Sequence, residues 1–74
     1  MDERKEQLRK LGFNIARIRE KSGLSQSDLA RMLGYTGHAY ISRVESGAKA
    51  PSMKFVLSVA QILEVPPKEF FEDL

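Results

Sequence analysis

The segment LSQSDLARMLGYTGHAYISRVESGAKAP, residues 24–51, decides the fold that the sequence predicts. Ser25 is a favourable helix N-cap, because its hydroxyl accepts a hydrogen bond from the free N–H groups of a first helical turn. Asp28 follows at the spacing of a capping box, with Asp in place of the usual Glu or Gln. Apolar residues then recur on one helical face, at Leu29, Ala30 and Leu33. Gly34 is expected to end this first short helix.

A second short helix is predicted after a break in the chain. Ile41 and Val44 give it an apolar face, and Gly47 ends it ahead of Pro51. Two short helices around a turn that contains glycine are the layout of a helix-turn-helix, which places its second helix in the DNA major groove. Residues 25–46 therefore predict a binding geometry as well as a fold.

Several motifs occur at linked spacings along the chain. They are Gly23-Leu24-Ser25-Gln26, Asp28-Leu29-Ala30, Leu33-Gly34, Ile41-Ser42-Arg43-Val44-Glu45, Gly47, Pro51-Ser52, Ala60, Leu63-Glu64-Val65 and Glu69-Phe70-Phe71. Together they resemble the Xre/Cro family of helix-turn-helix regulators, which includes the lambdoid phage repressors, over roughly residues 11–71. The chain departs from the family pattern at Glu64, where glycine is usual. It also has six residues, 35–40, between Leu-Gly and Ile-Ser, where the family usually has five.

Five helices are predicted, and no segment shows the strict alternation of a half-buried strand. The first has an apolar stripe at Leu8, Leu11, Ile15 and Ile18. The predicted ranges are 3–21, 26–33, 37 or 38 to 46 with Thr36 as N-cap, 52–63 with Ser52 as N-cap, and 66–73. The expected fold class is an all-α, five-helix, lambda-repressor-like domain with the helix-turn-helix as its second and third helices.

The predicted core consists of apolar residues at helical spacing. It contains Ile15, Ile18, Leu24, Leu29, Ala30, Leu33, Ile41, Val44, Val56, Val59, Ala60, Leu63 and Val65, with Phe70 closing it. The length of 74 residues predicts a single domain, 1–74, of modest stability. The sequence has no cysteine and one histidine, so we expect neither a disulfide nor a metal site nor a cofactor. No apolar run is long enough to span a membrane, and no signal peptide is recognised, which predicts a cytoplasmic protein.

The net charge of +2 is small, but the charges are unevenly distributed. Residues 1–31 carry eight basic and five acidic side chains, whereas residues 32–74 carry four basic and five acidic ones. The acidic excess lies at the extreme C-terminus, at Glu69, Glu72 and Asp73. A DNA-binding protein would keep this end away from phosphates. Solvated helix faces are the alternative interpretation of these charges.

The outward residues of the second short helix are candidates for reading bases. The candidate set is His38, Ala39, Ser42 and Arg43. Arg43 is the strongest of them, because its planar guanidinium can donate two hydrogen bonds to guanine; a phosphate contact is its alternative role. Ala39 is suited to contact a thymine methyl group. His38 has the alternatives of a base or phosphate contact and simple solvent exposure.

A second set of residues is expected to contact phosphates. It comprises Gln26, Thr36, Gly37, Tyr40, Ser46 and Lys49. Gln26 starts a helix, where the free N–H groups attract anions, and the resemblance implies a backbone contact for it. Tyr40 has two alternatives, a phosphate contact through its hydroxyl or packing of its ring on the domain. Weaker phosphate candidates are Arg9, Lys10, Arg17 and Arg31.

Two further roles concern structure and assembly. The resemblance implies that Arg19 and Glu45 form an ion pair that fixes the angle of the recognition helix; unrelated surface charges are the alternative. Residues 52–73 are expected to provide a homodimer surface, because this region has more apolar side chains than one core face needs. The surface candidates are Phe55, Ile62, Phe71 and Leu74. The alternative for Phe55 and Ile62 is that they enlarge the core.

These observations favour a sequence-specific, DNA-binding transcriptional regulator. We expect a homodimer that reads a palindromic operator with recognition helices roughly 34–36 Å apart, in the manner of a restriction–modification controller or a phage-type repressor. The alternative is an antitoxin-like interaction module that masks a partner protein. Besides double-stranded DNA and a second copy, the expected partners are RNA polymerase for a regulator and a toxin-like protein for an interaction module. No catalytic residue is assigned, because His38 has no acidic neighbour in sequence and there is no Gly-rich phosphate loop.

Overall fold

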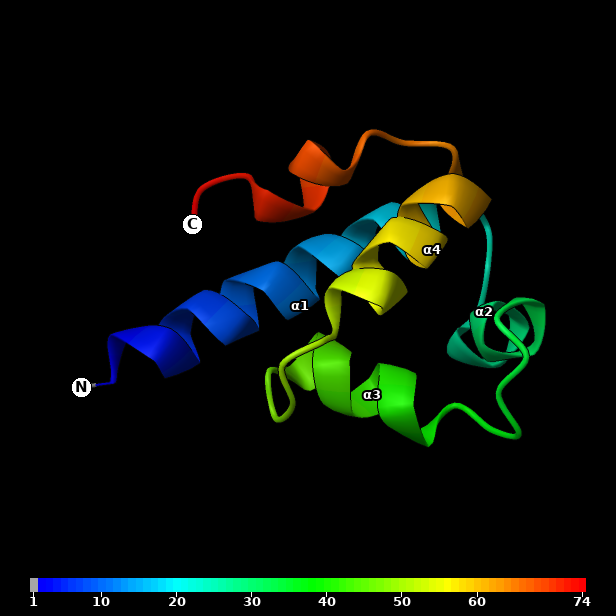
Figure 1. Cartoon of the computed structure of the whole chain (residues 1–74), viewed down its shortest axis with the longest axis horizontal. Coiled ribbons are helices and arrows are strands. Elements are labelled where there is room, and N and C mark those ends of the chain that lie inside the picture. Colours follow the sequence, from blue (N-terminus) through cyan, green and yellow to red (C-terminus); the bar gives the residue numbers. More distant parts are fainter. Residues whose placement is uncertain (1) are drawn as a thin grey trace.

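The computed structural model describes residues 2–74 and contains four α-helices followed by a short 3-10 helix. The elements are α1 (Glu3–Lys21), α2 (Gln26–Met32), α3 (Ala39–Ser46), α4 (Met53–Leu63) and η1 (Pro67–Phe71). Figure 1 shows α3 along one edge of the molecule, with α1 crossing the middle and η1 on the other side of α1. The predicted all-α helix-turn-helix fold is therefore confirmed. No helix within residues 2–74 is long and apolar enough to cross a membrane.

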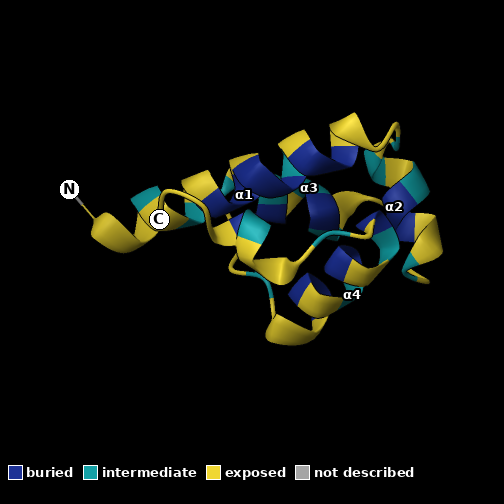
Figure 2. Ribbon diagram, turned by 90° about the horizontal axis from the view of Figure 1, so that it is seen from above, coloured by how far each residue is buried: buried dark blue, intermediate teal, exposed yellow. Residues whose placement is uncertain are grey.

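Helix α1 is the element on which the others assemble. It contacts both α3 and η1, and its buried apolar residues are Leu11, Ile15 and Ile18. The exposed residues of α1 lie along its outer side in Figure 2, while its buried residues face the other elements. This division follows from the three- and four-residue spacing of its apolar side chains, which places them on one side of a helix.

Side-chain caps start the helices where the sequence predicts them. Ser25 and Asp28 form a reciprocal capping box at the start of α2, in which each side chain accepts a hydrogen bond from the other residue's backbone N–H, both at 2.9 Å. The bond from the Ser25 backbone, followed by the bond with its hydroxyl, lowers the pKa of Asp28 below its ordinary value. Ser52 caps α4 by accepting from the Phe55 N–H at 3.1 Å. These bonds satisfy N–H groups that have no partner inside the helix.

The helices α2, α3 and α4 end in the same hydrogen-bonding pattern, in which a residue just after the helix adopts the left-handed backbone conformation. The left-handed residue is Gly34 after α2 and Gly47 after α3, both with φ 84°. Their N–H groups and those of the next residues bond back to carbonyls of the last turn, as in a Schellman motif. At the end of α4 the same conformation is adopted by Glu64, with φ 58°. Glycine has no side chain to oppose this conformation, whereas glutamate does.

The buried core agrees with the prediction for most residues. Its members are Leu11, Ile15, Ile18, Leu29, Ala30, Ile41, Val44, Phe55, Val56, Val59, Ala60, Leu63 and Phe70. Leu24, Leu33 and Val65 were predicted to be in it but are only partly buried against it. Leu11 and Phe55 are additions. Leu11 joins because α1 is covered by α3 on one side and by η1 on the other.

The fifth element differs from the prediction, because it is a 3-10 helix that ends at Phe71 rather than an α-helix that reaches residue 73. Pro66 and Pro67 stand at the N-cap and first positions of this element, where a missing N–H is tolerated. Asn14, which is buried in α1, donates from Nδ2 to the carbonyl oxygens of Phe70 and Glu72, each at 3.0 Å. A side chain therefore satisfies carbonyl groups at the end of the element, where a helix leaves its last carbonyls without an internal partner.

The crossing of α1 and α3 depends on the absence of a side chain at Gly12. A Cβ atom on Gly12 would overlap the carbonyl oxygen of Val44 and lie 2.5 Å from that of Glu45. Glycine is a poor residue for the middle of a helix, and its presence in a 19-residue helix indicates a packing requirement. Gly12 lets the backbones of α1 and α3 approach closely, and this approach sets the position of α3.

Candidate nucleic-acid interface

One face of α3 is uncovered by the rest of the protein. Ala39, Arg43 and Ser46 follow at four- and three-residue spacing on this face and are exposed, while Ile41 and Val44 point into the core. In Figure 1 no other element lies beyond α3 on this side. A short helix that is held by one apolar face and open on the other can enter the major groove of DNA, which is wide enough for an α-helix.

The other candidate base readers lie at the same face or at its beginning. His38 is exposed immediately before α3, and Ser42 is half-buried. Lys49 is exposed in the loop after α3, where Ala48 and Lys49 donate their backbone N–H groups to the carbonyl oxygen of Arg43. The structure thus brings the candidates from the turn, α3 and the following loop together on one side of the molecule.

The start of α3 differs from the sequence prediction. The helix begins at Ala39 with His38 at the N-cap position, so Thr36 is not the N-cap, and His38 makes no side-chain capping bond. Within residues 2–74, the backbone N–H groups of Thr36, Gly37 and His38 donate no hydrogen bond to the protein. The additional residue, relative to the family pattern, is therefore accommodated in an extended turn before the helix. This turn presents free N–H donors beside a surface hollow that is also lined by Arg31.

Tyr40 packs its ring on the domain, which was one of its two expected roles. The ring is partly buried against the core, and its hydroxyl oxygen accepts from the Ser52 N–H at 3.3 Å. The ammonium group of Lys49 lies 6.0 Å from the centroid of the ring, at the limit of a cation–π contact. The hydroxyl proton of Tyr40 remains available to a further acceptor, because the bond with Ser52 uses only the oxygen as acceptor.

Arg19 and Glu45 form the ion pair that the family resemblance implies. Arg19 Nε donates to Glu45 Oε2 at 2.7 Å, and Arg19 Nη2 donates to Oε1 at 3.0 Å. The two side chains are only 8% and 6% exposed. Arg19 Nη1 also donates to the carbonyl oxygen of Leu24 at 2.7 Å. The bond to Glu45 raises the pKa of Arg19 above its ordinary value, against the opposing effect of burial. The guanidinium thus joins α1, the loop before α2, and α3.

Gln26 belongs to the same network. It occupies the first position of α2 and donates from Nε2 to Glu45 Oε1 at 2.8 Å. Because an amide nitrogen carries two hydrogens, one donor of Gln26 is left for an external acceptor. Glu45 therefore holds the side chain of Gln26 in place while α3 is fixed to α1.

Sequence reasoning missed two residues that position other elements on α1: Gly12, which faces α3, and Asn14, which holds the C-terminal segment. A signal for Gly12 was present, because an isolated glycine inside a predicted helix points to a close packing contact. Asn14 is a polar residue on the buried face of α1, between Leu11 and Ile18. Its partners are backbone carbonyls 56 and 58 residues away, so no local rule could have identified them.

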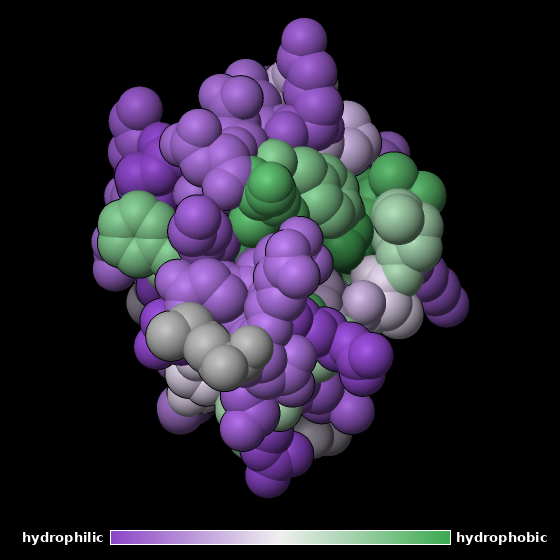
Figure 3. Space-filling model, turned by 90° about the vertical axis from the view of Figure 1, so that its left-hand side faces the viewer, coloured by the Kyte–Doolittle hydropathy of each residue, from purple (hydrophilic) through white to green (hydrophobic). Residues whose placement is uncertain are grey.

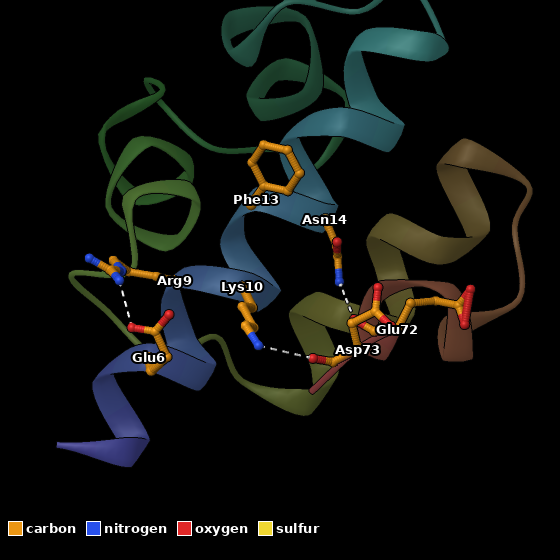
Figure 4. A pocket seen from close by; sticks show the side chains of 7 residues that line it. All are labelled: Glu6, Arg9, Lys10, Phe13, Asn14, Glu72 and Asp73. Carbon is orange, nitrogen blue, oxygen red and sulfur yellow. Dashed lines mark hydrogen bonds and ion pairs between the residues drawn. The ribbon is translucent and has the colours of Figure 1, made fainter. Parts of the chain in front are cut away.

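A surface hollow of about 620 Å³ lies between α1 and the C-terminal segment (Figure 4). Its lining residues are Glu6, Arg9, Lys10, Phe13, Asn14, Glu72 and Asp73. Arg9 pairs with Glu6 at 2.6 Å, and Lys10 donates to the carbonyl oxygen of Asp73 at 3.4 Å. Both basic residues, which were weaker phosphate candidates, are thus engaged in contacts within the protein. Phe13 is 65% exposed at the rim.

Phe55 is not at the surface, in contrast to the prediction of a dimer contact there. It is 3% exposed, because the rings of Tyr35 and Tyr40 pack over it. Ile62 is partly buried against the core, while Phe71 and Leu74 are exposed. The outward apolar residues of α4 are Met53 and Leu57, which lie one helical turn apart and are 61% and 51% exposed. The outward apolar residues of α4 therefore lie about half a turn around the helix from Phe55 and Ile62, while the predicted core residues of α4 are buried.

Comparison with known proteins gives consistent results. The family described as helix-turn-helix matches residues 15–70. Among solved structures, the chain is similar to the restriction-modification controller protein C.AhdI from Aeromonas hydrophila, with 31% sequence identity and a TM-score of 0.86. The similarity covers 95% of this chain and 100% of that chain. No curated protein matches the sequence. The extent of the family match and the uncovered recognition helix lead to one assignment: the chain belongs to the Xre/Cro-like helix-turn-helix family of DNA-binding regulators.

Proposed function

We propose that the protein is a sequence-specific transcriptional regulator that binds a palindromic operator as a homodimer. The observation that carries this proposal is the uncovered face of α3, which is held rigidly by Gly12 and by the Arg19–Glu45 ion pair. A helix fixed in this way can present side chains to base edges at a defined depth in the major groove. As a protein that binds operator DNA, it would act in the cytoplasm.

The contacts divide into base reading and phosphate binding. The base-reading residues are His38, Ala39, Ser42 and Arg43, and the phosphate-binding residues are Gln26, Thr36, Gly37, Tyr40, Ser46 and Lys49. Exposure of α3 and its flanking loops supports both sets. The free backbone N–H groups of the turn and the unused donor of Gln26 support the phosphate contacts, since donors of this kind bind phosphate oxygens well.

The dimer surface is proposed to lie on α4 and the C-terminal segment of the single domain. Its apolar side chains are Met53, Leu57, Ile62, Phe71 and Leu74, of which all but Ile62 are exposed. Figure 3 shows the end of the molecule that carries both termini, where an apolar region is surrounded by hydrophilic side chains. A symmetric contact uses the same patch twice, and it would place two copies of α3 on one side of the DNA.

The regulated system is proposed to be a restriction–modification operon. The support is the similarity to a restriction-modification controller protein along the whole length of that protein. A controller protein that occupies an operator changes the access of RNA polymerase to the promoter beside it, so no enzymatic step is required.

Selection of binding sites from random duplex DNA at about 150 mM salt tests this function directly. We expect a two-fold symmetric motif with half-sites about 10 base pairs apart. Enrichment of single, unpaired half-sites would contradict the homodimer, and the absence of any motif would contradict sequence-specific binding.

Arg43→Ala is expected to relax the preference at one base pair in each half-site. Arg43 is the exposed α3 side chain with the largest number of hydrogen-bond donors, and a bidentate contact to guanine contributes about 1–3 kcal/mol of discrimination. The measurement is a repeat of the site selection with the variant. An unchanged motif with uniformly lower affinity would instead assign Arg43 to a phosphate.

Lys49→Ala is expected to weaken binding to all duplex sequences by a similar factor. Loss of one phosphate contact lowers the slope of log K against log salt concentration by about one, because one fewer counterion is released. Fluorescence anisotropy at several salt concentrations measures the slope. Lys68→Ala is a matched control, since it removes the same charge from η1, which lies on the other side of α1 from α3 (Figure 1). Equal slopes for the two variants would argue against a contact by Lys49.

A further inference from the structure

Three aromatic rings from three elements form one cluster beside the recognition helix. Tyr35 comes from the turn after α2, Tyr40 from α3 and Phe55 from α4. The ring of Tyr35 stacks on Phe55 at 6.4 Å and meets Tyr40 edge-on at 5.5 Å, while Tyr40 meets Phe55 edge-on at 5.0 Å, all between centroids. These are the offset and edge-to-face arrangements that aromatic rings prefer.

The turn between α2 and α3 depends on this cluster for its course. The backbone N–H of Tyr35 bonds to the carbonyl oxygen of Ala30 at 2.9 Å and completes the end of α2. The next three residues, 36–38, are exposed, and their N–H groups donate no hydrogen bond within the described residues 2–74. The ring of Tyr35 thus packs the start of the turn on the body of the protein, ahead of three exposed residues that donate no backbone hydrogen bond.

We propose that Tyr35 is a positioning residue for DNA recognition, whose ring, held by Phe55 and Tyr40, fixes the turn that carries His38 and Ala39 to the DNA. It acts through these residues and contacts no base itself. The turn is one residue longer than the family pattern, and additional length gives a chain more conformations unless a contact restricts them. This inference rests on the proposed function, since it concerns how the same surface reads a sequence.

The proposal predicts that affinity for the operator falls more than affinity for non-specific DNA. Tyr35→Ala is expected to lower the ratio of specific to non-specific affinity about tenfold, which corresponds to about 1.4 kcal/mol, a value in the range of one or two aromatic pairs. The sequence preference is lost at the base pairs that lie near the N-terminus of α3. The base pair that Arg43 reads keeps its preference. Affinity for non-specific duplex falls much less, because Gln26, Ser46 and Lys49 lie outside the turn and keep their phosphate contacts.

The experiment compares the wild-type chain with three variants by site selection and by competition binding. Tyr35→Phe keeps the ring and is expected to select the wild-type motif with wild-type specificity. Tyr35→Leu keeps an apolar side chain without a ring and is expected to lose specificity as Tyr35→Ala does. Because Tyr35 is 39% exposed, all three variants are expected to fold, and circular dichroism melting checks this. The leucine variant is the second measurement should the alanine variant melt early.

Each outcome separates the two proposals. A wild-type protein that selects no motif would overturn the proposed function and, with it, this inference. A clear wild-type motif that Tyr35→Ala or Tyr35→Leu selects with unchanged specificity would overturn the inference alone. Equal losses of specific and non-specific affinity would reduce Tyr35 to a stabilising residue, which also overturns a positioning role.

Discussion

Gly12→Ala is expected to lower the free energy of unfolding by about 2 kcal/mol. Forcing an added methyl group into a packed contact costs up to about 3 kcal/mol, and the better helix propensity of alanine offsets about 1 kcal/mol of it. The group would meet the backbone carbonyls of Val44 and Glu45, which cannot rotate away as a side chain can. Either α3 moves away from α1 or its last turn distorts. Thermal denaturation should show a decrease of about 10 °C in the melting temperature.

The matched control for this prediction is Gly37→Ala. A Cβ atom at Gly37 would meet no atom within 4 Å, and its φ lies outside the left-handed region. We expect its melting temperature to stay within a few degrees of that of the wild-type protein. If Gly12→Ala were as stable as this control, α1 and α3 would not be in close contact at this point. Gly12→Ala should also weaken specific DNA binding, because it displaces the recognition helix.

Arg19→Met is expected to destabilise the protein by about 3–5 kcal/mol, the usual result of leaving one buried charge without its partner. Glu45 would keep only the hydrogen bond from Gln26, in a site where its side chain is 6% exposed. The Leu24 carbonyl would also lose its donor. Chemical denaturation by urea measures the change. A small single domain has a total stability of about 5–15 kcal/mol, so this loss is a large fraction of the total.

The double variant Arg19→Met, Glu45→Leu distinguishes pairing from packing. Removing both charges eliminates the unpaired carboxylate, so the double variant should be more stable than Arg19→Met. If the destabilisation of the double variant equalled the sum of those of Arg19→Met and Glu45→Leu, the two side chains would not be energetically coupled. Even with restored stability, the double variant should bind its operator more weakly than the wild-type protein does. Gln26 would lose the acceptor that orients its side chain.

The sequence was sufficient to predict the features that depend on local chemistry. Ser25 with Asp28, Ser52 and Gly47 mark helix ends through bonds with residues close in sequence, and the structure contains these caps and ends. The apolar spacing in α1 likewise follows from helix geometry alone. The family motif supplied the Arg19–Glu45 pair, which no local rule predicts because the residues are 26 positions apart.

Features that depend on long-range packing could not be predicted. Phe55 and Leu57 are both apolar residues of α4, and only the aromatic rings of Tyr35 and Tyr40 decide that Phe55 is the buried one. Similarly, Thr36 is a suitable N-cap by residue type, but α3 begins only at Ala39. The residue before Thr36, Tyr35, is held by stacking on Phe55, a long-range contact.

The left-handed conformation of Glu64 leaves the natural sequence below its attainable stability. A non-glycine residue in this conformation costs about 1 kcal/mol, which a change to glycine would recover. New operator preferences arise through substitutions on the recognition helix, and most substitutions in a small protein reduce its stability. Glu64 follows α4, outside the recognition helix. Glu64→Gly is therefore a single substitution that can compensate for a destabilising change on the recognition helix. It allows DNA specificity to diverge without loss of folding.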